Sequence, residues 1–183
     1  MSIYIHFKLL ILRIITRYIS KKVTLVRDNV GLSKAVTIGV LYRYETPAKH
    51  ETVQRFIRAL KNLDKKVSIL CYTNTKDRMH PNSNLLYSFG HEAITLLGRT
   101  NSDRVQKFID TSFDYLFHAD IVSNPTLDYI VAKSQSKCRV GCFDTLRKPL
   151  FEVMVKVHAT DQPLEDTKRL TSSMLHYTSR MER

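Results

Sequence analysis

The chain of 183 residues is long enough for one domain with a sizeable core, and 43% of its residues are apolar. Five Gly and five Pro residues are too few for a linker-rich or low-complexity protein. Three cysteines exclude a disulfide framework, so the sequence predicts a protein of the reducing cytoplasm.

The formal net charge of +12 is concentrated near the N-terminus, where residues 1–34 hold seven basic residues and one acidic residue, Asp28. This asymmetry favours an anionic partner such as a membrane surface or RNA, with solubility and non-specific attraction as the alternative explanation. No DNA-binding motif is present. The basic residues expected to contact such a partner are Lys8, Arg13, Arg17, Lys21 and Lys22.

Residues 1–22 are the most apolar stretch, but charges interrupt it well before the roughly 20 residues that span a bilayer. The order of charges and apolar residues does not fit a cleaved signal peptide. We predict an amphipathic helix that packs on the domain or lies in the plane of a membrane, with an uncleaved signal anchor as a third reading. Residues 1–34 would be this helix and a linker, followed by a single α/β domain over 35–183. The apolar side of the helix would carry Leu9, Leu12, Ile15 and Ile19.

From Ala35 onward, buried apolar runs alternate with helical patterns. The helix starts carry capping signals at Thr46-Pro47, Ser102 and Asn124-Pro125, and a last helix begins near Pro163. The polar stretch 74–84 is typical of a loop. The expected strands cover residues 35–42, 66–73, 93–98, 113–120, 137–143 and 151–157.

Strands that alternate with helices imply right-handed crossovers and parallel pairing. The sequence therefore predicts a Rossmann-like three-layer α/β/α sandwich with a mostly parallel six-stranded sheet, preceded by the N-terminal amphipathic helix. Only the short stretch "DTLRKP" separates the last two strands, so we expect one of them to be antiparallel.

The stretch "FDYLFHADIVSNPTLDYIVAKSQSKCRVG" combines a Phe-Asp strand, a helix with a central Tyr-Ile, a Ser-rich end and Arg-Val-Gly. In these features it resembles an uncharacterised family of Bacteroidota proteins, a domain of unknown function with no catalytic residues to carry over. The Arg-Val-Gly strand is also similar to one in bacterial heptosyltransferase-type glycosyltransferases. The first resemblance implies a Rossmann-like fold with no known activity.

Parallel α/β sheets bind ligands beyond the carboxyl ends of their strands. The first strand is followed by basic residues at a helix N-terminus, a place that favours anions. Neither G-x-G-x-x-G nor a P-loop is present, so NAD binding in the usual mode is disfavoured and we predict no cofactor. The residues at these strand ends that we expect to bind an anionic ligand, a nucleotide or phosphate, are Arg43, Lys49, His50, Thr73, Asn74 and Gly141.

His118 and Asp120 follow the fourth predicted strand and are weak candidates for a general base and its orienting carboxylate. Cys138 and Cys142 would lie roughly 13 Å apart in an extended strand, too far to bridge or to share one metal ion. A site formed by Cys142 with Cys71 and His118 is the remaining metal arrangement, and we predict no metal.

Three functions compete on these grounds. The first is a non-catalytic or regulatory module that binds an anionic small molecule at the strand ends. The second is an adaptor, peripheral on the inner face of the membrane or bound to RNA, that acts through its basic helix. The third is a small transferase or hydrolase of glycosyltransferase type, which the missing glycine fingerprints disfavour.

Overall fold

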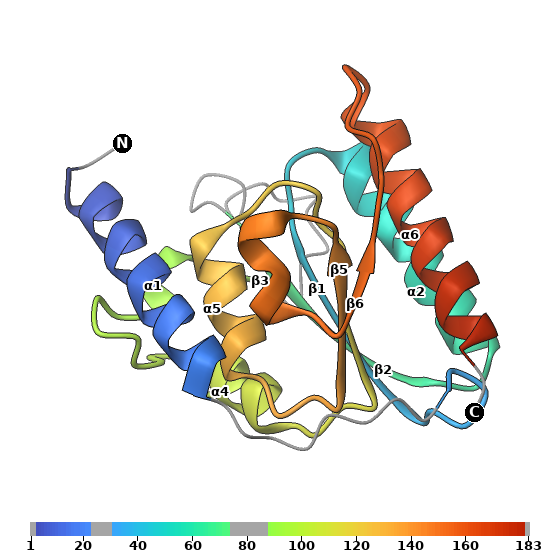
Figure 1. The fold of residues 1–183 in the computed structure, drawn as a ribbon, viewed down its shortest axis with the longest axis horizontal. Helices are drawn as coiled ribbons and strands as arrows, with labels where there is room; N and C mark the ends of the chain where they lie inside the picture. Colours follow the sequence, from blue (N-terminus) through green and yellow to red (C-terminus); the bar gives the residue numbers. More distant parts are fainter. Residues whose placement is uncertain (1–2, 23–30, 74–87, 182–183) are drawn as a thin grey trace.

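A six-stranded parallel sheet forms the centre of the structure, a computed structural model that describes residues 3–22, 31–73 and 88–181 (Figure 1). The strand order is β3-β2-β1-β4-β5-β6, and every neighbouring pair is parallel. This is the order of a doubly wound Rossmann sheet, so the predicted fold is confirmed. The strands are β1 (Thr37–Arg43), β2 (Lys66–Tyr72), β3 (Ser88–Phe89), β4 (Tyr115–His118), β5 (Cys138–Cys142) and β6 (Val153–Val155).

Helices cover both faces of the sheet (Figure 1). One face carries α1 (Ile3–Lys22), α4 (Asp103–Asp110), α5 (Pro125–Lys133) and the 3-10 helix η2 (Thr145–Leu150). The other face carries α2 (Pro47–Asn62) and α6 (Pro163–Arg180). A short 3-10 turn, η1 (His91–Ala93), follows β3. The hydrophobic core is accordingly divided into two clusters, one on each side of the sheet.

The central strand β1 shows why the strands are continuous apolar runs. Ile38, Val40 and Tyr42 belong to the cluster beneath α2 and α6, whereas Leu41 belongs to the cluster beneath α5. Because successive side chains of a strand point to opposite faces and both faces are covered, every position must be apolar.

The helix starts follow the predicted capping signals. The Thr46 hydroxyl accepts a hydrogen bond from the backbone N–H of Lys49, and Ser102 caps α4 in the same way. The Asn124 carboxamide oxygen accepts from two backbone N–H groups in the first turn of α5. Each cap satisfies donors that the helix leaves unpaired.

Two expectations about strands are wrong. The third strand is Ser88–Phe89 rather than residues 93–98. In that stretch Ala93 ends η1, and the residues after it form a tight turn closed by a bridge between Ile94 and Thr100. The turn includes Gly98 at a positive φ of 76°, and Leu97 is exposed, so this apolar stretch is not a buried strand. The predicted loop at 74–84 lies outside the described residues.

The last two strands are parallel, not antiparallel, with Val140 opposite Val153 and Cys142 opposite Val155. The expected short loop is the 3-10 helix η2, and β6 begins only at Val153. Residues 143–152 are therefore enough to bring the chain from the carboxyl end of β5 back to the level at which β6 begins, as a parallel connection requires.

Helix α1 packs against α5. Its inner side contains Leu12, which is fully buried, together with Ile15 and Ile19, which contact the core cluster beneath α5. Lys8 is buried as well, and its ammonium group donates to the carbonyl oxygen of His91. Lys8 therefore does not belong to an exposed basic surface, in contrast to the prediction. Of the helices in the described ranges, none has the length and apolar character needed to cross a bilayer.

Candidate functional site

The carboxyl ends of β1 and β4 lie side by side at the point where the chain leaves the sheet toward opposite faces, α2 on one and α5 on the other. In doubly wound folds this switch point is the usual ligand crevice. Two hollows lined by described residues lie near it. One lies toward α2 and contains the predicted residues Arg43, Lys49 and Asp120, and the other lies between α1, α5 and η2.

The hollow toward α2 is small, about 120 Å³, and its charges are paired. Asp120 is 2% exposed, accepts a hydrogen bond of 2.7 Å from the backbone N–H of Arg43 and forms an ion pair with Lys49. Lys49 also pairs with Glu45 at 3.1 Å, and Arg43 pairs with Glu45. Asp166 of α6 lines the hollow as well, so two cations face three carboxylates and no positive charge is in surplus for an anion.

The other predicted ligand residues are not gathered into one site. His50 lies 2.8 Å from the hydroxyl of Tyr42, and burial lowers its pKa. Thr73 follows β2 and is fully buried. Gly141 is the next-to-last residue of β5, where the ring of Phe151 covers it. Asn74 is outside the described residues.

His118 ends β4 and is completely buried, with neither ring nitrogen hydrogen-bonded. Burial lowers its pKa to about 4, so the imidazole is neutral at physiological pH. Its ring lies 5.8 Å from that of Phe151. The carboxylate of Asp120 is engaged by Arg43 and Lys49 instead of His118, so the predicted base lacks both solvent access and its orienting partner.

The three cysteines are free thiols buried in the sheet. Burial raises the pKa of the Cys71 thiol to about 12, which disfavours the thiolate that a metal requires. Across residues 3–22, 31–73 and 88–181, no three His, Cys, Asp or Glu side chains are close enough together to bind one ion. The arrangement of Cys71, His118 and Cys142 is therefore not formed.

The second hollow, here called the α1–α5 cavity, has a volume of about 240 Å³. The segments that leave the carboxyl ends of β4 and β5 form two of its walls, and α1 forms the third. It is lined by Arg13, Thr16, Arg17 and Ser20 of α1, by Ser123, Pro125 and Asp128 around the start of α5, and by Asp144, Leu146, Arg147, Pro149 and Leu150 of the η2 segment.

Arg147 is the central polar residue of this cavity and is 4% exposed. Its Nε donates to Asp144 at 3.1 Å and its Nη2 donates to the carbonyl oxygen of Ile121 at 2.8 Å. Its Nη1 has no hydrogen-bond partner and lies 3.7 Å from a carboxylate oxygen of Asp128. A buried guanidinium donor without an acceptor is costly unless something else accepts from it.

Further polar side chains line the cavity. Thr16 is buried and its hydroxyl has no hydrogen-bond partner. Ser123 donates to Asp128 at 2.6 Å, which leaves the other Asp128 oxygen toward Arg147. Arg13 and Arg17 are exposed at the rim. Three guanidinium groups thus face two carboxylates, and the surplus charge of the cavity is positive.

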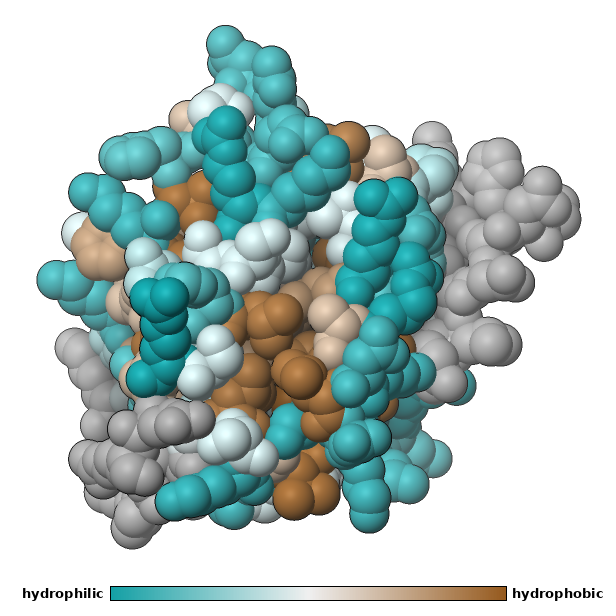
Figure 2. All heavy atoms as spheres, turned by 90° about the vertical axis from the view of Figure 1, so that its right-hand side faces the viewer, coloured by the Kyte–Doolittle hydropathy of each residue, from teal (hydrophilic) through white to brown (hydrophobic). Residues whose placement is uncertain are grey.

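The opposite face of the molecule has a shallower hollow between α2 and α6. Figure 2 shows apolar surface in the middle of this face with hydrophilic side chains around it. The hollow is lined partly by Phe56, Ala59 and Leu175. Its cations have acidic partners on their own helices, since Arg55 pairs with Glu51 and Lys168 pairs with Glu165. This face is therefore less suited to an anion than the α1–α5 cavity.

The sequence predicts only some of the residues that line the α1–α5 cavity. Arg13 and Arg17 belong to the predicted basic surface, and the start of α5 was predicted from its Asn-Pro cap. Thr16, Asp128 and Arg147 were missed, because three segments far apart in the chain bring them together. The one local signal for Arg147 is the Asp-x-x-Arg spacing from Asp144, which caps η2.

Strand order, helices on both faces and a cavity beside the strand ends define a Rossmann-like α/β protein. A family model described as "family of unknown function (DUF6913)" matches residues 8–179, and the chain belongs to that family. No protein of curated function matches the sequence.

Among solved structures, the chain is similar to the Escherichia coli heptosyltransferase WaaC with ADP, at 6% identity and a TM-score of 0.47. It is also similar to WaaC with ADP-2-deoxy-2-fluoro heptose, at 9% identity and a TM-score of 0.43. The similarity covers 80% of this chain in both cases, and 49% and 50% of the two WaaC chains. The chain thus corresponds to about half the length of these enzymes.

Proposed function

We propose that the protein is a binding module for a small anionic ligand, a nucleotide or sugar phosphate, held in the α1–α5 cavity. The observation that supports this proposal most directly is the pair of buried groups without hydrogen-bond partners, Arg147 Nη1 and Thr16 Oγ1, on the cavity wall. A phosphate oxygen accepts from both a guanidinium and a hydroxyl, so it would satisfy two groups that the protein leaves unpaired.

The charge of the rim supports an anion. Arg13 and Arg17 lie one helical turn apart on α1, and no carboxylate of the described residues lies within ion-pair distance of either. Arg147 is already balanced by Asp128 and Asp144. The uncompensated charge therefore lies at the mouth, where it attracts an anionic ligand, and the arginine forks suit phosphate or carboxylate oxygens.

The remaining lining supports a ligand with a hydroxylated or apolar body. The free oxygen of Asp128 can accept from a sugar hydroxyl, and Leu146, Pro149 and Leu150 offer apolar contact. The volume of about 240 Å³ is below the roughly 300–1,000 Å³ of pockets for drug-sized ligands. This size favours a mononucleotide or a sugar phosphate over a dinucleotide.

Binding without catalysis is the function that the geometry favours. The transferase or hydrolase alternative assigned the base to His118, which is buried and has no orienting partner. The predicted residues Arg43 and Lys49 are neutralised by Glu45 and Asp120, which favours the α1–α5 cavity over the hollow toward α2.

The test is a thermal-unfolding screen of the full chain with inorganic phosphate, nucleoside monophosphates and hexose phosphates, each beside its unphosphorylated counterpart. A ligand that binds only the native state raises the melting temperature. We expect at least one phosphate compound to do so in a dose-dependent manner, and its neutral counterpart to have no effect.

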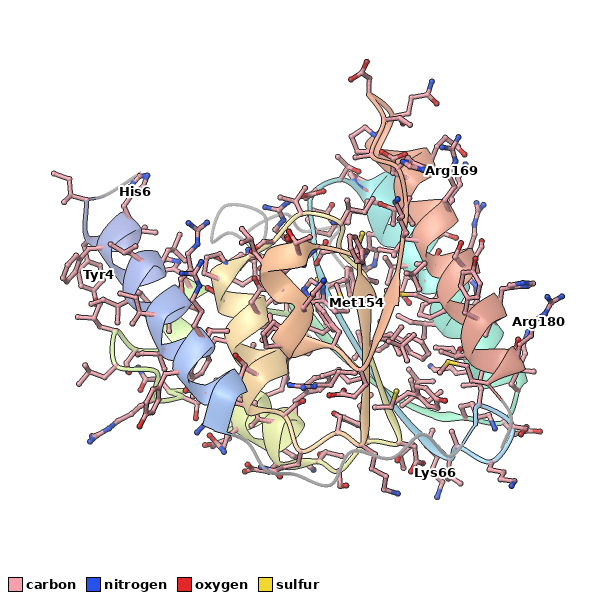
Figure 3. The ribbon with its side chains drawn as sticks, in the orientation of Figure 1. Tyr4, His6, Lys66, Met154, Arg169 and Arg180 are labelled. Atoms are coloured by element: carbon pink, nitrogen blue, oxygen red, sulfur yellow. The ribbon has the colours of Figure 1, made fainter. Side chains whose placement is uncertain are left out.

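The matched variants are Arg13→Gln with Arg17→Gln, and Arg169→Gln with Arg180→Gln. Each pair removes two exposed arginines, but Arg169 and Arg180 lie on α6, across the molecule from α1 (Figure 3). The first pair should weaken ligand binding at least about tenfold, and the second should leave it unchanged. Equal loss in both pairs would indicate non-specific attraction, and no shift with any phosphate compound would refute the proposal.

A further inference from the structure

The outward side of α1 is a row of large apolar side chains. Each of them is more than half exposed, and none belongs to either of the two hydrophobic clusters. Their spacing of three or four residues places them along one side of the helix, with Tyr4 beside the row. The row consists of Ile3, Tyr4, Phe7, Leu10, Ile14 and Tyr18.

This row is not needed to hold α1 on the domain. The opposite side of the helix does so through Leu12, Ile15 and Ile19 in the core, and through Lys8 bonded to His91. Figure 1 shows α1 at the edge of the molecule, and Figure 3 shows Tyr4 directed away from the rest of the protein. A surface helix ordinarily exposes polar residues there, so a contiguous apolar row indicates a binding surface.

The charge of α1 indicates which kind of partner covers the apolar row. The helix contains Lys and Arg but no Asp or Glu. Arg13 and Arg17 are exposed, and each follows a residue of the row, Leu10 or Ile14, by three positions. A second copy packed on the row would bring like charges together, and nucleic acid would leave the apolar side chains without a partner. An anionic bilayer surface matches both the apolar row and the cations.

We propose that α1 docks the protein on anionic membranes, with its outer row inserted at the headgroup boundary and Arg13 and Arg17 among the lipid phosphates. The helix lies in the plane of the membrane, because no described helix is suited to cross one. Tyr4, Phe7 and Tyr18 fit this position, since aromatic rings favour the membrane interface. The α1–α5 cavity then opens close to the membrane, because Arg13 and Arg17 lie at its rim.

Co-sedimentation of the full chain with vesicles of equimolar phosphatidylcholine and phosphatidylglycerol tests this proposal. The chain should bind these vesicles, bind phosphatidylcholine vesicles far less, and release as salt is added. Leu10→Gln with Ile14→Gln should reduce binding roughly tenfold or more, because two inserted aliphatic side chains are lost. The matched control, Leu63→Gln with Leu97→Gln, also removes two exposed aliphatic side chains and should bind as the wild type does.

These variants change exposed positions, so their melting temperatures should match that of the wild type. Neither Leu10 nor Ile14 lines the cavity, and any phosphate-induced thermal shift should be kept in the Leu10/Ile14 variant. Loss of vesicle binding therefore does not depend on the proposed ligand. The proposal is overturned if wild-type protein ignores anionic vesicles, if the variant still binds them, or if the row instead mediates dimerisation or binding of single-stranded RNA in parallel assays.

Discussion

Replacement of Gly141 by alanine gives the sharpest test of the packing in the sheet. A Cβ atom at this position would lie closer than 3.0 Å to three atoms of the Phe151 ring. The ring cannot move freely, because Phe151 is 7% exposed and its ring contacts both the guanidinium of Arg147 and the imidazole of His118. The substitution therefore overpacks the core cluster beneath α5.

Overpacking of this kind costs about 1–3 kcal/mol of unfolding free energy. Alanine regains about 0.5–1 kcal/mol, because glycine loses more backbone freedom on folding. The expected net loss is about 1–2 kcal/mol, or roughly 3–6 °C in melting temperature for a chain of this length. Urea unfolding followed by circular dichroism should show a lower midpoint with an unchanged slope.

A double-mutant cycle with Phe151→Ala identifies the cause. Removal of the ring alone should cost about 3–5 kcal/mol, but it also removes the clash, so Gly141→Ala should become nearly neutral in that background. If the alanine is tolerated in the wild type, or costs the same in both backgrounds, the ring is not what requires glycine at position 141.

Three further predictions concern buried polar groups. The pKa of His118 is about 4 in the folded state against 6.5 in the unfolded chain, so the protein becomes less stable as pH falls from about 6.5 to 4. His118→Leu should make the unfolding free energy in urea nearly independent of pH across that range and should cost little at pH 7. An unchanged dependence of stability on pH would contradict this. Burial alone would raise the pKa of Asp114, but hydrogen bonds from Lys137, Thr37 and Val36 hold it at about 2, so its contribution is complete above pH 4 and lost as pH falls toward 2. Asp114→Asn should cost on the order of 1–2 kcal/mol at pH 7 and almost nothing at pH 2, as acid titrations of stability would show. The carboxylate of Glu152 accepts hydrogen bonds from Arg139, from Nη2 at 2.7 Å and from Nε at 3.0 Å. Glu152→Gln should lower the unfolding free energy in urea by roughly 2–4 kcal/mol, because it leaves a buried guanidinium without its carboxylate. A loss below about 1 kcal/mol would count against the importance of this pair.

Most strands could be predicted because a strand covered on both faces is mostly apolar at successive positions, as in β1 and in Tyr115–Phe117 of β4. The third strand could not, since two residues are too few to show any period. The apolar stretch 93–98 was the stronger local pattern, yet it forms a turn in which Leu97 faces solvent. Local hydrophobicity does not determine which segment pairs with β2 as the edge strand of the sheet.

The basic residues show a similar division. The sequence pattern alone places Arg43 and Lys49 near a helix terminus, and it places Arg13 and Arg17 on a helix face. In the structure the first two are paired with carboxylates, one of them Asp120 from a strand end far along the chain. Arg13 and Arg17 pair with no carboxylate in the part of the chain that the structure describes. Electrostatic availability depends on which acidic residues the fold brings near, and sequence spacing does not contain that information.

By itself, the sequence determined the alternation of strands and helices, the helix caps and the amphipathic N-terminal helix, because these depend on local periodicity and capping chemistry. Tertiary structure alone decided the parallel direction of β6, the neutralised hollow toward α2, and the cavity where Thr16, Asp128 and Arg147 meet. It also decided which side of α1 is buried and which apolar row is left outside. These features arise from contacts between segments far apart in the chain, whose geometry is set only when the whole sheet and its covering helices assemble.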